Sequence, residues 1–244
     1  MCRCFVTALI WGLSFGAAHA SDKEDFITAN ILAVFYHELG HAVIDVEDLP
    51  IFGQEEDAAD VFSIYMIDAI YEAGPAMAFA YDTARGFMAE AELAERNGEE
   101  EDWSGMHGSS EQRYYNAVCI FYGGDPDTRA GFARDLGLPE DRAERCAEEF
   151  DQADHSWGRV LDDLMARGGG NSLRFQGRVS GSRAADILAE EAAFLNEVLR
   201  LSSPIRVVVE PCGEANAYYD PAAREIQFCE EYEGHFEDMA GWVR

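Results

Sequence analysis

The segment Phe35-Tyr-His-Glu-Leu-Gly-His-Ala42 constrains the fold of this chain more than any other. An apolar run, residues 31–35, leads into it at helical spacing, so we expect one helix through the whole segment. In a helix, His37 and His41 project from one face a single turn apart, as two ligands of one metal ion must. Glu38 points about 100° away around the helix, where it can take a proton from an attacking water. The segment therefore predicts two metal ligands and a general base.

A third metal ligand is expected from Glu56. A catalytic zinc ion has three protein ligands and one open position, so one ligand must come from outside the first segment. Pro50 and Gly53 end the first helix and allow the chain to reverse before a second helix begins. Asp60 follows Glu56 by four residues and shares its helical face. We expect Asp60 to accept the spare ring N–H of a ligating histidine.

The alternative interpretation of these residues is a surface helix with two ordinary histidines. Three features favour a metal site that holds Zn²⁺. The apolar run that leads into the segment predicts a buried helix, and Gly40 allows a neighbouring element to approach closely. A carboxylate-bearing helix then follows in the sequence.

Residues 1–20 have the pattern of a secretory signal peptide. Arg3 supplies a short positive end, residues 5–15 are largely apolar, and Ala18-His-Ala20 matches a cleavage site. The mature chain would start at Ser21 and be exported to the periplasm or the extracellular space. A retained N-terminal anchor is the alternative, but the apolar stretch is too short to span a bilayer. We expect no membrane contact after cleavage.

The chain is strongly acidic, with 47 acidic and 18 basic residues and a formal net charge of -29. This charge opposes binding to phosphate backbones and anionic membranes, so no nucleic-acid partner is expected. Residues 21–244 can bury a sizeable core, and no proline-rich or serine-rich linker divides them. They are predicted to form a single domain, and the sequence leaves the oligomeric state open.

Hydrophobic periodicity predicts a mainly α fold of the α+β class, a zincin-like helical domain with a small C-terminal β-hairpin or sheet. Helices are expected at about 21–46, 55–73, 76–97 and 182–201. Two β-branched runs, 205–210 and 225–229, are predicted to form the hairpin, joined through a turn at 216–221. Zinc peptidases commonly hold an extended substrate against a strand edge, and this hairpin is the candidate for that edge.

Two further residues are candidates for contact with a transition state. His107 lies in a loop between Gly105 and Gly108 that could wrap around a site, and a loop histidine without chemical function is the alternative. Tyr218 or Tyr219 could reach an oxyanion, although a packed tyrosine is the alternative for at least one of them. His155 and His235 stand in polar surroundings and are expected at the surface.

Four cysteines remain after removal of the signal segment, and they allow three disulfide connectivities. The sequential pairs 119–146 and 212–229 each close a compact loop. Export favours oxidation, so these two disulfides are predicted.

The sequence resembles a family of exported bacterial proteins assigned as candidate metallopeptidases and otherwise as a domain of unknown function. The resembling segments are His37-Glu-Leu-Gly-His-Ala42, Leu49-Pro50 with Gly53, Glu55-Glu-Asp-Ala-Ala-Asp60, Gln112-Arg-Tyr-Tyr-Asn116 with Cys119 and Tyr122-Gly123, and Glu214-Ala-Asn-Ala-Tyr-Tyr-Asp-Pro221. The Glu-x-x-Ala-Asp element is also similar to that of the CAAX prenyl endopeptidase group. In that group the corresponding glutamate binds zinc, so this resemblance implies Glu56 as a ligand.

Two functions follow as hypotheses. The first is a secreted zinc-dependent peptidase of the gluzincin type, which hydrolyses a peptide or protein substrate with Glu38 as general base. The second is a non-catalytic, zinc-containing extracytoplasmic binding protein. A structural zinc is closed by four protein ligands, whereas a catalytic one keeps an open position. Direct metal binding by Asp57 or His107 would therefore favour the binding protein.

Overall fold

The computed structural model describes residues 23–99, 104–177 and 181–241, so the predicted signal segment lies outside the described residues. The described part is mainly helical with a small sheet, as predicted. The helices are α1 Lys23–Val46, α2 Glu55–Ile70, α3 Ala73–Asn97, α4 Ser110–Gly123, α5 Pro126–Asp135, α6 Glu140–Ala143, α7 Cys146–Ala153, the π-helical turn η1 Asp154–Gly158, α8 Arg159–Ala166, α9 Arg183–Val198 and α10 Glu231–Ala240. The strands are β1 Leu173–Phe175, β2 Ile205–Glu210, β3 Ala217–Asp220 and β4 Glu225–Cys229.

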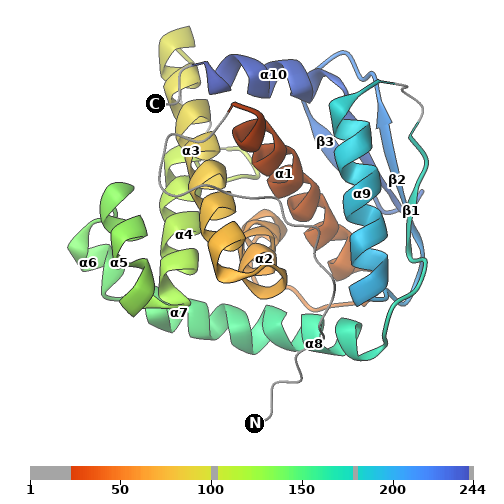
Figure 1. The fold of residues 1–244 in the computed structure, drawn as a ribbon, viewed down its shortest axis with the longest axis horizontal. Coiled ribbons are helices and arrows are strands. Elements are labelled where there is room, and N and C mark those ends of the chain that lie inside the picture. Colours follow the sequence, from red (N-terminus) through yellow and green to blue (C-terminus); the bar gives the residue numbers. More distant parts are fainter. Residues whose placement is uncertain (1–22, 100–103, 178–180, 242–244) are drawn as a thin grey trace.

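Helix α1 is the central element of the structure (Figure 1). It packs against α2, α3, α9 and α10 and against strands β3 and β4. By length and composition alone α1 could cross a membrane, but 83% of its most apolar window is buried inside the protein. A helix that is apolar on nearly all sides and covered by protein is a core helix. Residues 35–42 therefore lie on a core helix rather than on a surface helix.

Helices α1 and α2 approach each other closely at Gly40. A Cβ atom at this position would lie 3.1 Å from the Cα of Ala59 and 3.2 Å from the ring of Phe62. A side chain here would force the two helices apart by a few tenths of an ångström. The absence of one lets the first turns of α2 lie directly over the middle of α1, as predicted for this glycine.

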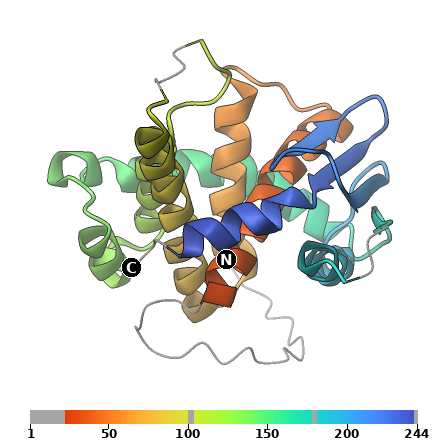
Figure 2. The same cartoon turned by 90° about the horizontal axis from the view of Figure 1, so that it is seen from above.

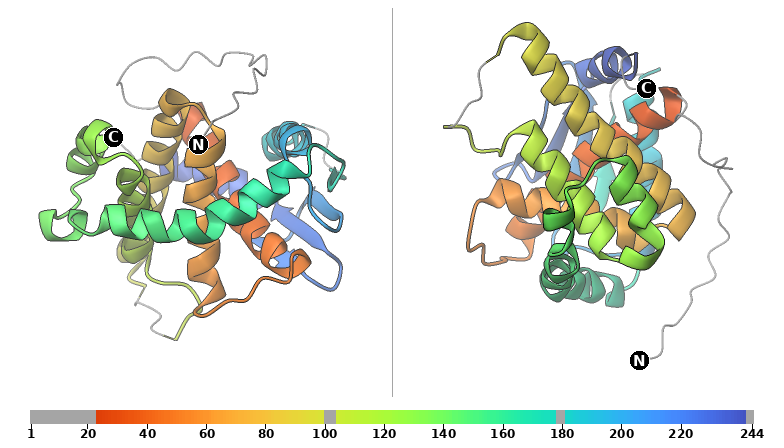
Figure 3. Two further views of the ribbon diagram at one scale, coloured as in Figure 1. Left: turned by 90° about the horizontal axis from the view of Figure 1, so that it is seen from below. Right: turned by 90° about the vertical axis from the view of Figure 1, so that its left-hand side faces the viewer.

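A third layer of helix supports α2 from the other side. The continuous run α7–η1–α8 crosses the other helices at one end of the molecule (Figure 3). From this run Trp157 donates its Nε1–H to the carbonyl of Ala58 at 3.1 Å, and Tyr65 donates its hydroxyl to Asp154 at 2.6 Å. These contacts fix the start and the middle of α2 relative to the run α7–η1–α8.

The sheet has the strand order β1-β2-β4-β3 and lies to one side of the helices (Figure 2). The prediction of a hairpin from 205–210 and 225–229 is wrong, because β2 and β4 pair in parallel. The segment predicted as their turn contains strand β3, which pairs antiparallel with β4. Residues 211–224 are long enough for the chain to return along the sheet before β4, and Tyr218 and Tyr219 favour a strand. Strand β1 was not predicted.

Both predicted disulfides are present. Cys119–Cys146 joins α4 to α7, and Cys212–Cys229 joins the segment that precedes β3 to the end of β4. The second disulfide therefore ties down the loop that leads into the edge strand.

A buried carboxylic acid links α1 to α9. Glu191 is 8% exposed and accepts hydrogen bonds from the hydroxyls of Tyr36 at 2.6 Å and Tyr71 at 3.2 Å. Burial raises the pKa of Glu191 to about 7, although the two tyrosine hydroxyls oppose this effect. The neutral form is therefore the favoured form in the folded protein below about pH 7.

We predict that the folded protein loses stability between pH 5 and pH 8 through Glu191. The folded pKa lies above the unfolded value, so this contribution is present at low pH and is lost as pH rises through about 7. The loss reaches about 3 kcal/mol at most. Urea unfolding at pH 5.5 and pH 8 should show a smaller difference in Glu191→Gln than in the natural chain. An unchanged difference would contradict the prediction, and Glu148→Gln, on the exposed side of α7, is the matched control.

Candidate metal centre

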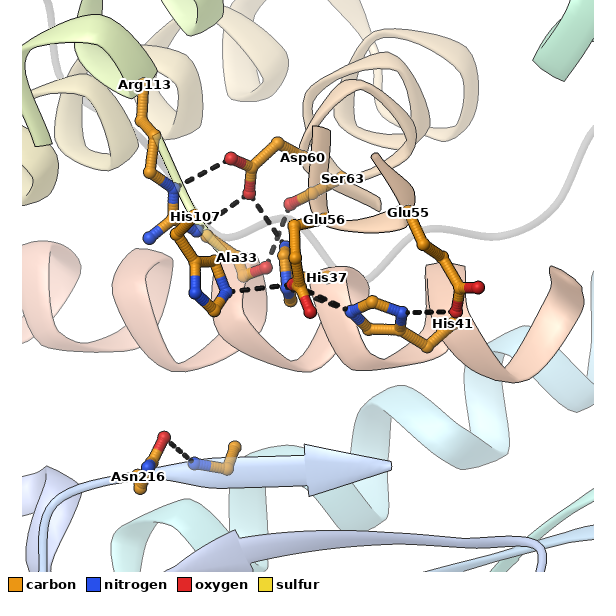
Figure 4. A network of polar contacts seen from close by, with 11 residues as sticks. Ala33, His37, His41, Glu55, Glu56, Asp60, Ser63, His107, Arg113 and Asn216 are labelled. Carbon is orange, nitrogen blue, oxygen red and sulfur yellow. Dashed lines mark hydrogen bonds and ion pairs between the residues drawn. The ribbon is translucent and has the colours of Figure 1, made fainter. Parts of the chain in front are cut away.

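Three metal-binding side chains converge where α1 meets α2. His37 and His41 come from α1 and Glu56 from the first turn of α2, and they form one group of candidate ligands. The two histidine Nε2 atoms lie 3.2 Å apart, and each lies 3.1 Å from the same oxygen of Glu56 (Figure 4). The sequence separation of the histidines and the reversal before α2 thus place the three predicted ligands together.

The donor set and its spacing fit a zinc-like ion. Donor atoms at roughly 2.0–2.2 Å from a tetrahedral ion lie roughly 3.3–3.6 Å from one another, close to the separations found here. Two imidazole nitrogens with one carboxylate oxygen are also a donor set of catalytic zinc. A divalent cation would be held by His37, His41 and Glu56.

The electrostatics of the three residues favour positive charge at this point. Burial lowers the pKa of His37, but hydrogen bonds with Asp60 and Glu56 outweigh it and raise the pKa to about 9. The hydrogen bond with His37, together with the nearby histidines, lowers the pKa of Glu56 to about 2 against the effect of its burial. The carboxylate is thus ionised at neutral pH and available to a cation.

Asp60 lies behind His37, on the side away from Glu56. Its Oδ1 is 2.7 Å from the His37 Nδ1, the position at which a carboxylate orients a ligating histidine. Burial raises the pKa of Asp60, but Arg113 and His37 outweigh it and hold the pKa well below its usual range. Asp60 therefore stays ionised and can hold the ring of His37 in one orientation.

Arg113 is a residue whose place in this network the sequence did not reveal. It donates from Nε and Nη2 to the two oxygens of Asp60, both at 2.7 Å. Its guanidinium also lies 4.6 Å from the centre of the Phe87 ring. Arg113 thus fixes Asp60, which in turn contacts His37. The sequence indicated only that Arg113 lies at the start of a helix after the His107 loop. It did not indicate that Arg113 contacts Asp60.

Glu38 is 7% exposed and stands next to His37 on α1. Burial raises its pKa, the two histidines lower it, and the net result is a raised pKa. Its carboxylate also accepts a hydrogen bond from the backbone N–H of Tyr219 in β3. The carboxylate is therefore held between the metal ligands and the edge strand, with an affinity for protons above that of an ordinary glutamate.

His107 lies at the site, as expected for this loop. Its Nε2 is 2.8 Å from the Glu56 oxygen, and its ring centre is 5.6 Å from that of His37. The side chain is 45% exposed, and His107 is not part of the group of candidate ligands. Burial and the nearby Arg113 lower its pKa. Because the ionised Glu56 carboxylate can only accept, the neutral imidazole of His107 donates its single N–H to it through Nε2.

The two tyrosines of β3 direct their hydroxyls away from the three candidate ligands. Tyr218 donates to Glu214 at 2.5 Å, and Tyr219 donates to Asp45 at 2.6 Å. Tyr218 is 37% exposed and lines the same cleft as the metal ligands. The geometry does not bring its hydroxyl to the position at which His37, His41 and Glu56 meet.

The candidate ligands open into a cleft of about 1210 Å³. Its walls come from α1, α2, α3, α4, β3 and α10. His235, predicted to lie at the surface, is instead part of this wall and lies 2.6 Å from the carboxylate of Glu90. The helical context of residues 231–240 was not recognised, so the prediction for His235 is wrong. His155 is exposed, as expected.

The outer edge of β3 faces the metal ligands across this cleft. The backbone N–H of Cys229 donates to the carbonyl of Asn216, so in this antiparallel register Tyr218 and Asp220 direct their backbone groups toward β4. The backbone groups of Ala217 and Tyr219 then face the other edge. The N–H of Tyr219 reaches Glu38, as described above, which places this edge beside α1.

The fold and the site together define a helical protein with a candidate metal centre of two histidines and one carboxylate beside a strand edge. A family model described as "Putative metallopeptidase" matches residues 4–161 and 175–241, and the chain belongs to this family. This assignment implies a peptidase role and a metal cofactor. Neither curated proteins nor solved structures gave a match.

We predict that Arg113→Ala weakens metal binding about 10–100-fold without unfolding the protein. Loss of the guanidinium leaves the half-buried Asp60 without its charge partner, so the orientation of His37 becomes less defined. Metal affinity can be measured by competition with a chromophoric chelator, with circular dichroism as a check on folding.

Arg142→Ala is the matched control for this variant. Arg142 forms a comparable pair with Glu149 beside the Cys119–Cys146 disulfide, outside the cleft. Equal losses of metal affinity in the two variants would show that Arg113 acts through general stability.

Proposed function

We propose that this protein is an exported zinc-dependent peptidase of the gluzincin type, with His37, His41 and Glu56 as metal ligands. The observation that carries the proposal is the convergence of these three donor atoms, with Glu38 next to them, at the floor of a large cleft. Asp60 orients His37 in this proposal. The two disulfides support export, because disulfides persist in oxidising compartments.

A bound zinc ion would act as a Lewis acid that polarises the scissile carbonyl and makes water more acidic. Glu38 supplies the general base. Its carboxylate accepts a proton from the attacking water and later donates it to the amine that leaves. The raised pKa of Glu38 suits this exchange, because a base whose pKa lies nearer the working pH can both take and return a proton.

Strand β3 is the proposed site for the substrate backbone. An extended peptide that pairs with the outer edge of β3 would use the backbone carbonyls of Ala217 and Tyr219, because their N–H groups already donate to the Asn216 side chain and to Glu38. The contact between Tyr219 and Glu38 fixes the distance from this edge to the general base. His107 and Tyr218 line the same cleft. Of the two, His107 contacts a proposed metal ligand, and its Nε2–H would become available to a developing oxyanion when Glu56 binds the metal instead.

The second candidate function is a binding protein in which zinc is structural. Such a site needs four protein ligands, and the group found among the described residues contains three. Asp57 is exposed and lies outside the group, and His107 contacts Glu56 rather than completing the group. A group of three protein ligands supports the peptidase.

We predict that Glu38→Gln retains zinc but loses peptide hydrolysis by about 100–10,000-fold, because the amide cannot accept the proton of the attacking water. Bound metal can be measured by mass spectrometry and hydrolysis with a mixed peptide library, with and without chelator. Glu56→Gln is the companion variant and should lose both metal and activity. Full activity in Glu38→Gln would remove this residue as the base, and metal that resists chelators together with no hydrolysis would favour the binding protein.

A further inference from the structure

We propose that the cleft binds peptides rich in lysine and arginine, an inference that deepens the peptidase function proposed above and rests on it. Within the described part of the chain, seven carboxylates line the cleft, against a single arginine. Three of these carboxylates, Glu38, Glu56 and Asp60, already have roles in the metal centre. The other four are Asp45, Glu55, Asp57 and Glu90. Of these, Glu55 lies 2.8 Å from the Nδ1 of His41, Asp45 accepts from the Tyr219 hydroxyl, and Glu90 lies 2.6 Å from His235.

The single arginine cannot receive an acidic substrate. Arg113 gives two hydrogen bonds to Asp60 and lies against the ring of Phe87. A bound divalent cation and this arginine together offset three of the seven negative charges. His235 offsets a further one where it is protonated, because its contact with Glu90 raises its pKa. The cleft remains negative in every case.

The four remaining carboxylates come from different walls of the cleft. Asp45 stands on α1, Glu55 and Asp57 on the first turn of α2, and Glu90 on α3. Asp57 is exposed, and the side chain of Glu90 is 34% exposed. Side chains of an extended peptide project alternately to opposite sides. Basic side chains would therefore find a carboxylate on more than one wall.

Thr83 gives a second, independent sign of a ligand in the same cleft. This residue lines the cleft, is 3% exposed, and its hydroxyl has no hydrogen-bond partner among the described residues. Its neighbours Asn30 and Ser63 have partners in Phe26 and Ala33. A buried hydroxyl without a hydrogen-bond partner costs free energy. A polar group of a bound peptide would act as that partner.

The charge of the whole molecule acts in the same direction. The formal net charge of -29 produces a field that raises the local concentration of cations. A cleft with walls of one sign concentrates this field further. Salt screens such attraction over about 10 Å at 0.1 M, so the preference for basic peptides should fall as salt is added.

Binding to Glu38→Gln loaded with Zn²⁺ tests the inference without any hydrolysis. Three labelled peptides share one uncharged central sequence and carry lysine, glutamine or glutamate on both flanks. Fluorescence anisotropy at 20 mM and 500 mM NaCl gives their affinities. We expect the lysine peptide to bind at least 10-fold more tightly than the glutamate peptide in low salt, with a smaller ratio in high salt.

A pair of double variants locates the effect. Asp57→Asn with Glu90→Gln removes two charges from the cleft wall and should reduce the preference for lysine several-fold. Glu140→Gln with Glu148→Gln removes two charges from exposed positions on α6 and α7, neither of which lines the cleft. This control should leave the preference nearly unchanged.

The outcomes separate this inference from the proposed function. Equal affinity for the three peptides, a preference for glutamate, or no binding of any peptide would overturn the basic-peptide inference. Hydrolysis of neutral peptides by the natural chain together with equal binding would overturn it while the peptidase function stands. A lysine preference that both double variants reduce equally would assign it to net charge and not to the cleft.

Discussion

The contact between α1 and α2 is the constraint on which the rest of this structure depends. Two histidines on one helix make a metal site only if a third donor is held a few ångströms away, and that donor here stands on a separate helix. Gly40 permits the approach, because Ala59 and Phe62 occupy the space that a side chain would take. Burial of α1 on nearly all sides then prevents the two helices from shifting. The helical spacing of the two histidines and the packing of α2 on α1 thus together determine where the three donor atoms meet.

The charged groups beside the candidate metal ligands form a chain of contacts. This chain of contacts runs from Arg113 through Asp60 to His37, one of the candidate metal ligands. Each side chain in it is a hydrogen-bond partner of the next. Removing one member would leave a buried charge without a partner, which costs more than the pair contributes. Glu191 shows the opposite solution. With no cation beside it, its carboxyl group favours the neutral form, held by two tyrosine hydroxyls.

The sequence predicted what depends on local spacing and failed where distant segments meet. The spacing of His37 and His41, the reversal before Glu56 and the four-residue step to Asp60 placed these residues correctly relative to one another. Their chemical roles remain proposals. The parallel pairing of β2 with β4 could not be predicted from the sequence. A β-branched run favours a strand but does not indicate whether that strand pairs in parallel or antiparallel. Arg113 and His235 were missed for a related reason, since their partners lie far away in the chain.

The disulfide between Cys212 and Cys229 bears on when the proposed peptidase would become active. It anchors the loop that enters β3, the strand whose N–H group reaches Glu38. In a reducing cytoplasm this disulfide would be missing, so in the newly made chain the strand beside Glu38 would be less constrained. For the exported peptidase proposed above, activity would then depend on oxidation after export, and the producing cell would be protected from it until that point.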